Sequence, residues 1–165
     1  DQSVPGWPKD RPAAVLGAGG AARAICSGLL QAGVPSVRLL NRTRARAETL
    51  AAAFGDRIEV VDWTECGQAL AGAGLLTNTT SLGMTKQPPL EIELDELPGD
   101  GVVYDIVYVP LETDLLAQAR ARDLACVDGL GMLLHQARPG FHRWFGVDAQ
   151  VTPDLHQSVI KDLLP

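Results

Sequence analysis

The 165-residue sequence has few cysteines, few lysines and no long run of apolar residues. Its three cysteines, Cys26, Cys66 and Cys126, are far apart and form no C-x-x-C pair. This spacing argues against a disulfide framework or a zinc site and favours the reducing cytoplasm, with each cysteine a small core or surface residue. No apolar run approaches the roughly 20 residues of a membrane span. The net charge of −6 gives no reason to expect nucleic acid or an anionic membrane as a partner.

The sequence is also poor in side chains that transfer protons near neutral pH. A general acid or base must lie beside the reacting atoms. The candidates are three histidines and three lysines: His135, His142, His156, Lys9, Lys86 and Lys161. We expect His142 and His156 at the surface of late helices, without partners, and Lys86 in an exposed loop. The chain is therefore expected to hold no catalytic residue and no metal site.

What the sequence does have is the composition of an ordinary globular domain. Apolar residues make up 46% and charged residues 21%, enough to bury a core in a single domain of this length. The first stretch, DQSVPGWPKDRP, is polar and proline-rich, does not begin with Met and does not resemble a signal peptide. We expect residues 1–12 to be a linker remnant. Residues 13–165 are expected to form one domain, with two closing helices at its C-terminal end.

Short apolar runs alternate with longer segments of helical pattern along the whole chain. Strands are expected at 13–16, 36–40, 58–61, 74–78, 101–107 and 125–127. Helices are expected at 20–32, 43–54, 64–70, 112–122, 131–145 and 153–164. The expected strands are apolar throughout, as a sheet buried on both faces requires. The pattern predicts an α/β fold with a doubly wound, Rossmann-type parallel sheet and helices on both faces.

The first strand runs into a helix through the glycine-rich stretch AVLGAGGAARAI. Gly17, Gly19 and Ala22 fit the pattern G-x-G-x-x-G/A. In that pattern the first glycine makes a tight turn, the second lets a pyrophosphate approach the backbone, and the third small residue lets helix and strand pack closely. The phosphates would then meet free N–H groups at the start of the helix. The stretch indicates a dinucleotide site, the alternative being a glycine-rich turn without a ligand.

The end of the second strand, LLNRTRAR, bears on which dinucleotide binds. NAD-binding domains usually place Asp or Glu there to hold the ribose 2′-hydroxyl, and this chain has Asn41 instead. Without that carboxylate there is no repulsion toward a 2′-phosphate, and Arg42, Arg44 and Arg46 follow at once. Arginines in a first helical turn oppose the helix dipole, so a solvated structural role is the weaker alternative. The stretch favours NADP over NAD, with Arg42 and Arg46 as phosphate contacts and Arg44 facing water.

Two further stretches lie where strands are expected to end, at the edge of the sheet where ligands bind in this architecture. The loop NTTSLGM, residues 78–84, carries small hydroxyl side chains that could line a cofactor, or it is an ordinary loop. Tyr108, in YDIVYVP, lies at or just beyond the fifth strand. Its hydroxyl could meet a polar substrate, and a buried structural tyrosine is an equal alternative.

Five stretches in order make the chain similar to the shikimate dehydrogenase family from residue 13 to about 146: GAGGAARA, NRTRAR, NTTSLGM, DIVYVPLET and DGLGMLLHQA. The resemblance implies an NADP-dependent oxidoreductase that reversibly reduces 3-dehydroshikimate to shikimate with NADPH in aromatic amino-acid biosynthesis. Such enzymes have a front domain with a catalytic Lys and Asp pair and a rear NADP-binding domain. This chain resembles the rear domain. Its substrate would then be shared with a missing N-terminal domain, and the chain alone is expected to be inactive.

The resemblance also implies roles for individual residues of this chain. The loop that binds the pyrophosphate corresponds to Gly17, Ala18, Gly19, Gly20 and Ala21. The contacts to the adenosine 2′-phosphate correspond to Asn41, Arg42, Thr43 and Arg46. Residues near the nicotinamide correspond to Ile106, Gly129 and Met132, and the two residues that reach the substrate correspond to Tyr108 and Gln136.

Two alternatives stay open. A paralogue that acts on quinate or an amino-shikimate would select its substrate mostly with side chains of the missing domain, although paralogues that use NAD tend to have an acid near the end of the second strand. A non-catalytic module that binds NADPH would have no need of substrate-facing residues such as Tyr108 and Gln136.

Overall fold

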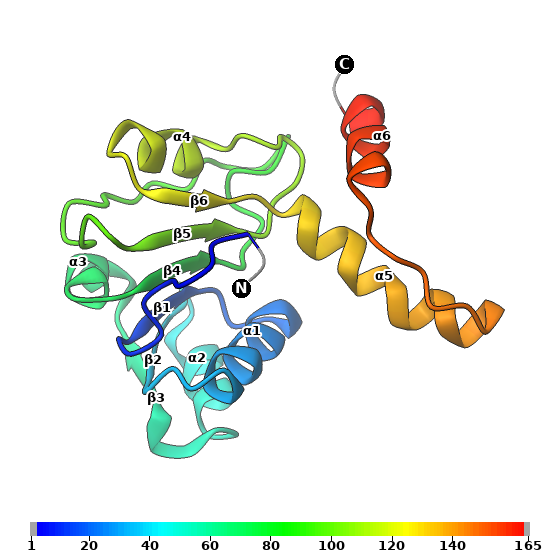
Figure 1. The fold of residues 1–165 in the computed structure, drawn as a ribbon. Helices are drawn as coiled ribbons and strands as arrows, with labels where there is room; N and C mark the ends of the chain where they lie inside the picture. Colours follow the sequence, from blue (N-terminus) through cyan, green and yellow to red (C-terminus); the bar gives the residue numbers. More distant parts are fainter. Residues whose placement is uncertain (1–2, 164–165) are drawn as a thin grey trace.

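The computed structural model describes residues 3–163 and contains a parallel sheet of six strands (Figure 1). The strands are β1 (Ala13–Leu16), β2 (Val37–Leu40), β3 (Ile58–Val61), β4 (Leu75–Asn78), β5 (Val102–Asp105) and β6 (Ala125–Val127). Their order across the sheet is β3-β2-β1-β4-β5-β6. The expected strands and the doubly wound α/β class are confirmed.

The strand order reverses between β1 and β4, and this reversal places the candidate site. The chain moves outward from β1 to β2 and β3, then returns to the other side of β1. In the strand register, Leu16 pairs with Leu40 and with Asn78, and Asn78 pairs with Asp105. The carboxyl ends of β2, β1, β4 and β5 therefore meet at one edge of the sheet, where open α/β sheets bind their ligands.

Helices connect the strands and follow the last one. Within residues 3–163 they are α1 (Gly20–Gln31), α2 (Arg44–Ala51), α3 (Cys66–Leu70), α4 (Asp114–Ala121), α5 (Leu130–Phe145) and α6 (Pro153–Leu163), with short 3-10 turns η1 (Gly55–Arg57) and η2 (Trp63–Glu65). Each expected helix is present, and α1 ends before Gly33, whose φ is +95°. None of the helices described in this range has the length and apolar character needed to cross a membrane.

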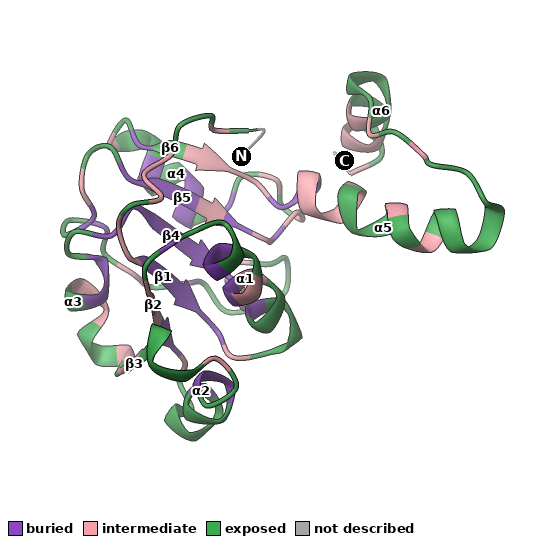
Figure 2. Ribbon diagram, turned by 60° about the horizontal axis from the view of Figure 1, so that its bottom comes forward, coloured by how far each residue is buried: buried purple, intermediate pink, exposed green. Residues whose placement is uncertain are grey.

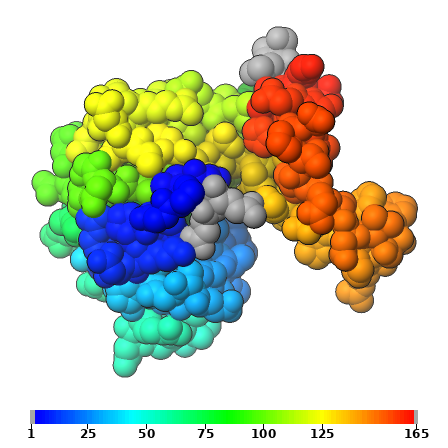
Figure 3. Space-filling view, viewed as in Figure 1, coloured from blue at the N-terminus to red at the C-terminus, as the bar shows by residue number. Residues whose placement is uncertain are grey.

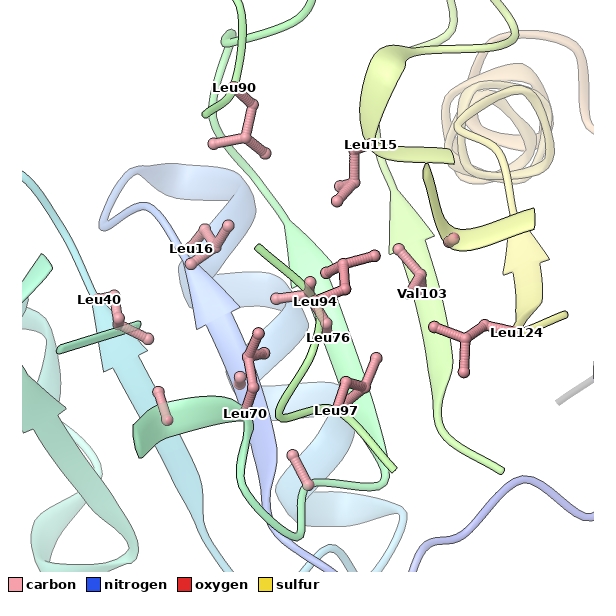
Figure 4. Close-up of a cluster of buried hydrophobic side chains, with 14 of the residues drawn as sticks. Leu16, Leu40, Leu70, Leu76, Leu90, Leu94, Leu97, Val103, Leu115 and Leu124 are labelled. Atoms are coloured by element: carbon pink, nitrogen blue, oxygen red, sulfur yellow. The ribbon is translucent and has the colours of Figure 1, made fainter. Parts of the chain in front are cut away.

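Apolar side chains on the two faces of the sheet form two clusters. The face beneath α3 and α4 carries mainly leucines, with Leu16, Leu70 and Leu76 close together (Figure 4). The opposite face packs Val15 and Leu39 against α1 and α2. Burying such a side chain contributes roughly 1.5–3 kcal/mol. Both β1 and β4 are buried at every position (Figure 2). The strand β1 is a continuous apolar run, whereas β4 ends in the buried polar residues Thr77 and Asn78, so the expectation of strands that are apolar throughout holds for β1 and not for β4.

The last two helices extend away from the sheet instead of covering it (Figure 1, Figure 3). Leu130 is the one buried residue of α5, and α6 has none among its described residues. Phe141, Trp144 and Phe145 are exposed, Trp144 by 78%. Both helices form where the sequence pattern predicts them, but they do not close the domain. A helical pattern predicts an apolar stripe and does not determine which surface the stripe packs on.

The segment before β1 lies against the sheet rather than apart from it. Val4 and Trp7 pack on the apolar cluster beneath α1 and α2. The N–H of Gly74 donates to the Pro12 carbonyl oxygen at 2.9 Å, and a Cβ at Gly74 would overlap the carbonyl oxygen of Pro8. The first two residues lie outside the described range, and the domain boundary expected after residue 12 stays a prediction.

Candidate nucleotide-binding site

Gly17, directly after β1, makes the tight turn that the glycine pattern predicts. Its φ is +106°, in the region that favours glycine, and its N–H donates to the Leu40 carbonyl oxygen at 2.7 Å. A Cβ at this position would lie 2.7 Å from the hydroxyl oxygen of Thr79. Any side chain would therefore collide with the loop after β4.

Beyond Gly17, the start of α1 is open. Outside the helix and its chain neighbours, no described atom lies within 4 Å of the position that a Cβ at Gly19 or Gly20 would take. The helix begins without a side-chain capping bond and without an acidic residue in its first turn. Ala22, the third small residue of the pattern, is fully buried. Free N–H groups and the positive end of the helix dipole thus face space that an anion could occupy.

The three arginines after β2 differ in their partners. Arg44 is held by two carboxylates: its Nε lies 2.9 Å from Glu48 and its Nη1 lies 2.8 Å from Asp62. Arg44 is thus paired, where the sequence predicted only contact with water. Arg42 and Arg46 form no ion pair with any residue of the described range. Their charges are left available to a ligand.

A hollow of about 320 Å³ joins the glycine turn to α2. Its lining includes Ala18, Gly19 and Gly20 from the turn, and the arginines Arg23 and Arg46 from α1 and α2. Arg23 is exposed and, within residues 3–163, has no ion-pair partner. The sequence prediction missed Arg23. Its signal was available, because Arg23 lies in the first turn of α1 and opposes the helix dipole as the arginines of α2 do.

Asn41 and Thr43 shape the turn between β2 and α2. The Asn41 side-chain amide donates to the Thr43 carbonyl oxygen at 2.8 Å. Thr43 occupies the N-cap position of α2, but its side chain makes no capping hydrogen bond. The Thr43 hydroxyl is exposed at the same end of the helix as Arg42 and Arg46.

The loop NTTSLGM after β4 lies against the glycine turn. Thr79 donates both its N–H and its hydroxyl to the Leu16 carbonyl oxygen, at 2.8 and 2.6 Å. Asn78 Oδ1 accepts from the N–H and the hydroxyl of Thr80, at 3.0 and 2.7 Å. These hydroxyl groups fix the loop to β1 and to itself. The role of the loop in lining a cofactor stays a prediction.

The residues expected near a nicotinamide follow β5 and β6. Gly129, which precedes α5, donates its N–H to the Val107 carbonyl oxygen at 3.1 Å. A Cβ at Gly129 would overlap the Ile106 carbonyl oxygen, so glycine is required where α5 begins against this loop. Ile106 and Tyr108 are partly exposed. The structure thus brings Ile106 and Gly129 into contact.

Met132 and Gln136 line a larger hollow of about 650 Å³, which also touches α1 and the sheet. Tyr104 lies on its wall, and burial, with Asp128 and then Asp105 nearby, raises the pKa of Tyr104 to about 12. Tyr108 does not line this hollow. The two residues that the resemblance assigns to the substrate are therefore not joined by it.

The titratable side chains differ in one respect from the prediction. His142 was expected to have no partner, but its Nδ1 lies 3.0 Å from Asp148. Across residues 3–163, no three His, Cys, Asp or Glu side chains gather as metal ligands. Burial raises the pKa of Cys26 and of Cys66 to about 11, so both stay thiols near neutral pH.

A family model described as "Shikimate / quinate 5-dehydrogenase" matches residues 3–85, just over half of the chain. The matched part contains the glycine turn, the arginines after β2 and the loop after β4. A shikimate dehydrogenase (NADP(+)) of Rhodopseudomonas palustris is 56% identical over all 165 residues, which cover 59% of that protein. One of Paramagnetospirillum magneticum is 58% identical over 160 residues, 96% of this chain and 58% of the relative. The chain thus spans about three fifths of the length of these relatives.

Solved structures agree with the fold. A quinate dehydrogenase from Corynebacterium glutamicum in complex with NAD has a TM-score of 0.86 and 28% identity, over 97% of this chain and 58% of that one. A shikimate 5-dehydrogenase from Thermus thermophilus in complex with NADP(H) and shikimate has a TM-score of 0.77 and 34% identity, over 96% and 57%. The two structures hold different dinucleotides, so similarity of fold does not choose between them.

Proposed function

Because the chain belongs to the shikimate / quinate 5-dehydrogenase family, we propose that it is the NADP(H)-binding part of an NADP-dependent shikimate dehydrogenase. The whole enzyme would reversibly reduce 3-dehydroshikimate to shikimate in aromatic amino-acid biosynthesis. One observation carries the proposal: Arg23 and Arg46, without ion pairs in the described range, line the hollow beside a glycine turn that is open at its helix end. Arg42, at the end of β2, is likewise exposed and without an ion pair in that range. The cytoplasm is the compartment we propose, since the three cysteines are free thiols.

Two groups of residues at the edge of the sheet would bind the two phosphate-bearing parts of the dinucleotide. The pyrophosphate would lie on the backbone of residues 17–21, where Gly17 admits no side chain and Gly19 leaves open space. The 2′-phosphate would meet the forked donors of Arg42 and Arg46, with Asn41 and Thr43 beside them. NADPH, when bound, supplies the hydride for the reduction.

The far half of the cofactor would lie over the ends of β5 and β6. Ile106, Gly129 and Met132 would flank the nicotinamide, and Tyr108 and Gln136 would contribute to the substrate site. The chain spans about 59% of the relatives' length, and we propose that the remainder carries the proton-transferring side chains. The chain alone would then bind NADP(H) and show no turnover of shikimate.

Calorimetric titration of the chain with NADP⁺, and separately with NAD⁺, tests the proposal. Clear binding of NADP⁺ with much weaker binding of NAD⁺ is the expected result, because the free guanidinium groups have no 2′-phosphate to contact in NAD⁺. Equal affinity for the two would contradict the role given to Arg42 and Arg46. Failure to bind either would contradict the cofactor site itself.

A quinate dehydrogenase that uses NAD is the second candidate, favoured by the TM-score of 0.86 to the C. glutamicum structure with NAD. The residue at the end of β2 argues against an NAD-dependent enzyme, because Asn41 occupies the position where a carboxylate would bind the ribose 2′-hydroxyl. Tighter binding of NAD⁺ than of NADP⁺ in the same titration would favour this candidate.

A further inference from the structure

The last residue of β5, Asp105, is fully buried. Its Oδ1 accepts from the Asn78 amide and the Val107 N–H, both at 3.0 Å. Its Oδ2 accepts from the Thr113 hydroxyl at 2.8 Å. No arginine, lysine or histidine of residues 3–163 forms an ion pair with it. One carboxyl group thus joins β4, the loop after β5 and the start of α4.

This arrangement is expensive in free energy and is not needed for packing. A buried carboxylate without a cation is unfavourable unless hydrogen bonds replace its hydration. Burial raises the pKa of Asp105, and the bonds from Val107, Thr113 and Asn78 act in the opposite direction. An apolar side chain at the end of β5 would join the surrounding leucine cluster without this cost. The contribution of Asp105 to the structure is therefore its three hydrogen bonds, not its packing.

Through Asn78 the network extends to the loop after β4. Asn78 donates to the carbonyl oxygen of Leu82 at 3.3 Å and accepts twice from Thr80. The Thr80 hydroxyl in turn accepts from the Leu82 N–H at 3.0 Å. This loop also holds Thr79, against which the Gly17 turn is packed. Thr79 itself is held by the Leu16 carbonyl oxygen of β1, so the wall of the glycine turn is fixed separately from the bonds of Asn78 and Asp105.

Through Val107 the network extends to the residues proposed near the nicotinamide. The Ile106 N–H donates to the Asn78 carbonyl oxygen at 3.1 Å, and the Val107 carbonyl oxygen accepts from Gly129. Ile106 and Tyr108 flank Val107 in the chain. The Asp105 carboxyl therefore fixes the backbone that carries both of them.

We propose that Asp105 is a positioning residue for the nicotinamide half of the site, holding the loops after β4 and β5 in the geometry that the far half of the cofactor requires. The inference rests on the proposed function, because it presupposes that a nicotinamide dinucleotide binds at this edge. Asp105 itself is fully buried, so it would act through these loops and not by contact with the cofactor. The adenosine half, held by the glycine turn and the arginines after β2, lies outside its hydrogen bonds.

The test compares two ligands on the same variants. Adenosine 2′,5′-bisphosphate carries the phosphates of the adenosine half, and NADP⁺ adds the nicotinamide half. In Asp105→Ala we expect the dissociation constant of NADP⁺ to rise about tenfold, with that of the bisphosphate changed less than about twofold. Asp105→Asn is expected to restore NADP⁺ binding to about the wild-type value, because its amide oxygen still accepts from Asn78 and Val107.

Three further variants keep the test decisive if Asp105→Ala does not fold. Thr113→Val removes one hydrogen bond to Asp105 and should shift the ratio of the two dissociation constants in the same direction, whereas Thr113→Ser should not. Leu70→Ala, a buried residue of α3 in the same cluster, lowers stability without touching the network and should leave the ratio unchanged.

The outcomes separate the inference from the function on which it rests. Equal weakening of both ligands in Asp105→Ala and Thr113→Val, or no weakening of either ligand in these two variants, would overturn the positioning role and leave the cofactor site standing. A wild-type chain that binds neither ligand would overturn the proposed function and the inference with it.

Discussion

The polar groups at the ends of β1 and β2 and those at the ends of β4 and β5 are organised in opposite ways. Arg42 and Arg46 are exposed and form no ion pair within the described range, and Arg46 lines the hollow beside the start of α1. Asn78 and Asp105 are fully buried, and each makes several hydrogen bonds. Exposed charges attract a phosphate over a distance, and salt screens them. Buried, satisfied groups fix loop geometry and are largely insensitive to salt. The first edge is suited to capture a ligand and the second to orient it.

The largest effect is expected from Gly17→Ala, which disturbs the glycine turn between β1 and α1. The φ of +106° and the 2.7 Å approach to Thr79 leave no room for a methyl group. We expect the unfolding free energy to fall by about 1–3 kcal/mol and NADP⁺ binding to be lost, measured by urea denaturation and calorimetry. Gly19→Ala is the matched control, because its φ is −92° and its Cβ would meet open space. It should weaken binding while leaving stability nearly unchanged, and equal stability of Gly17→Ala and wild type would contradict this account.

The next largest effect is a loss of NADP⁺ affinity that differs among the arginines after β2, according to whether each forms an ion pair. Arg42→Gln and Arg46→Gln should each raise the dissociation constant of NADP⁺ about tenfold, since each removes a charge-assisted bond to phosphate, and should leave that of NAD⁺ unchanged. Arg44→Gln is the control, because Arg44 is already held by Asp62 and Glu48, and its effect should stay below about twofold. Both sets are measured by calorimetry at two salt concentrations. A larger loss in Arg44→Gln than in the other two would show that the pairing does not decide the role.

A smaller effect is expected for Arg23, which lines the hollow beside the glycine turn. Arg23→Gln should weaken NADP⁺ and NAD⁺ alike, about threefold each, because the pyrophosphate near the turn is common to both. Arg57→Gln, an exposed arginine in η1 without an ion pair in the described range, is the matched control and should change neither. A loss of affinity for NADP⁺ alone would indicate that Arg23 contacts the 2′-phosphate and not the pyrophosphate.

The smallest effect concerns Tyr104 and appears only at alkaline pH. The native state raises the pKa of Tyr104 from its usual 10 to about 12, chiefly by burial. The native state therefore holds the phenolic proton more tightly than the unfolded chain does. The resulting stabilisation is complete below pH 10 and is lost as pH rises through 12. Denaturant midpoints measured across this range should fall more steeply for wild type than for Tyr104→Phe, and identical slopes would contradict the shift.

The sequence was sufficient for the elements because their signals are local. The strand segment AAVL is buried throughout and VRLL is buried except at Arg38. The glycines at 17 and 33 have the positive φ that the turn and the helix end require. The glycine pattern also predicted the close packing of Ala22, which is fully buried. Each of these features depends on residues within one turn or strand of one another.

The sequence was less informative where a partner lies far along the chain. Asp62, which pairs with Arg44, is eighteen positions away, just after β3. The sequence around Arg44 does not predict this ion pair. Asp105 was read as part of a strand, since its partners Asn78 and Thr113 lie on other elements. The sequence also did not predict that α5 extends away from the sheet, because that depends on contacts with residues far along the chain.

The sequence by itself determined the order of strands and helices, the tight turn at Gly17 and the cluster of arginines after β2, because backbone sterics and residue spacing act over a few positions. Only the tertiary structure decided which charges are unpaired, that a single buried carboxyl joins the loops after β4 and β5, and that α5 and α6 leave the sheet. Those outcomes depend on which distant groups meet when the parallel strands align their carboxyl ends, and hydrogen bonds and ion pairs form only at that contact.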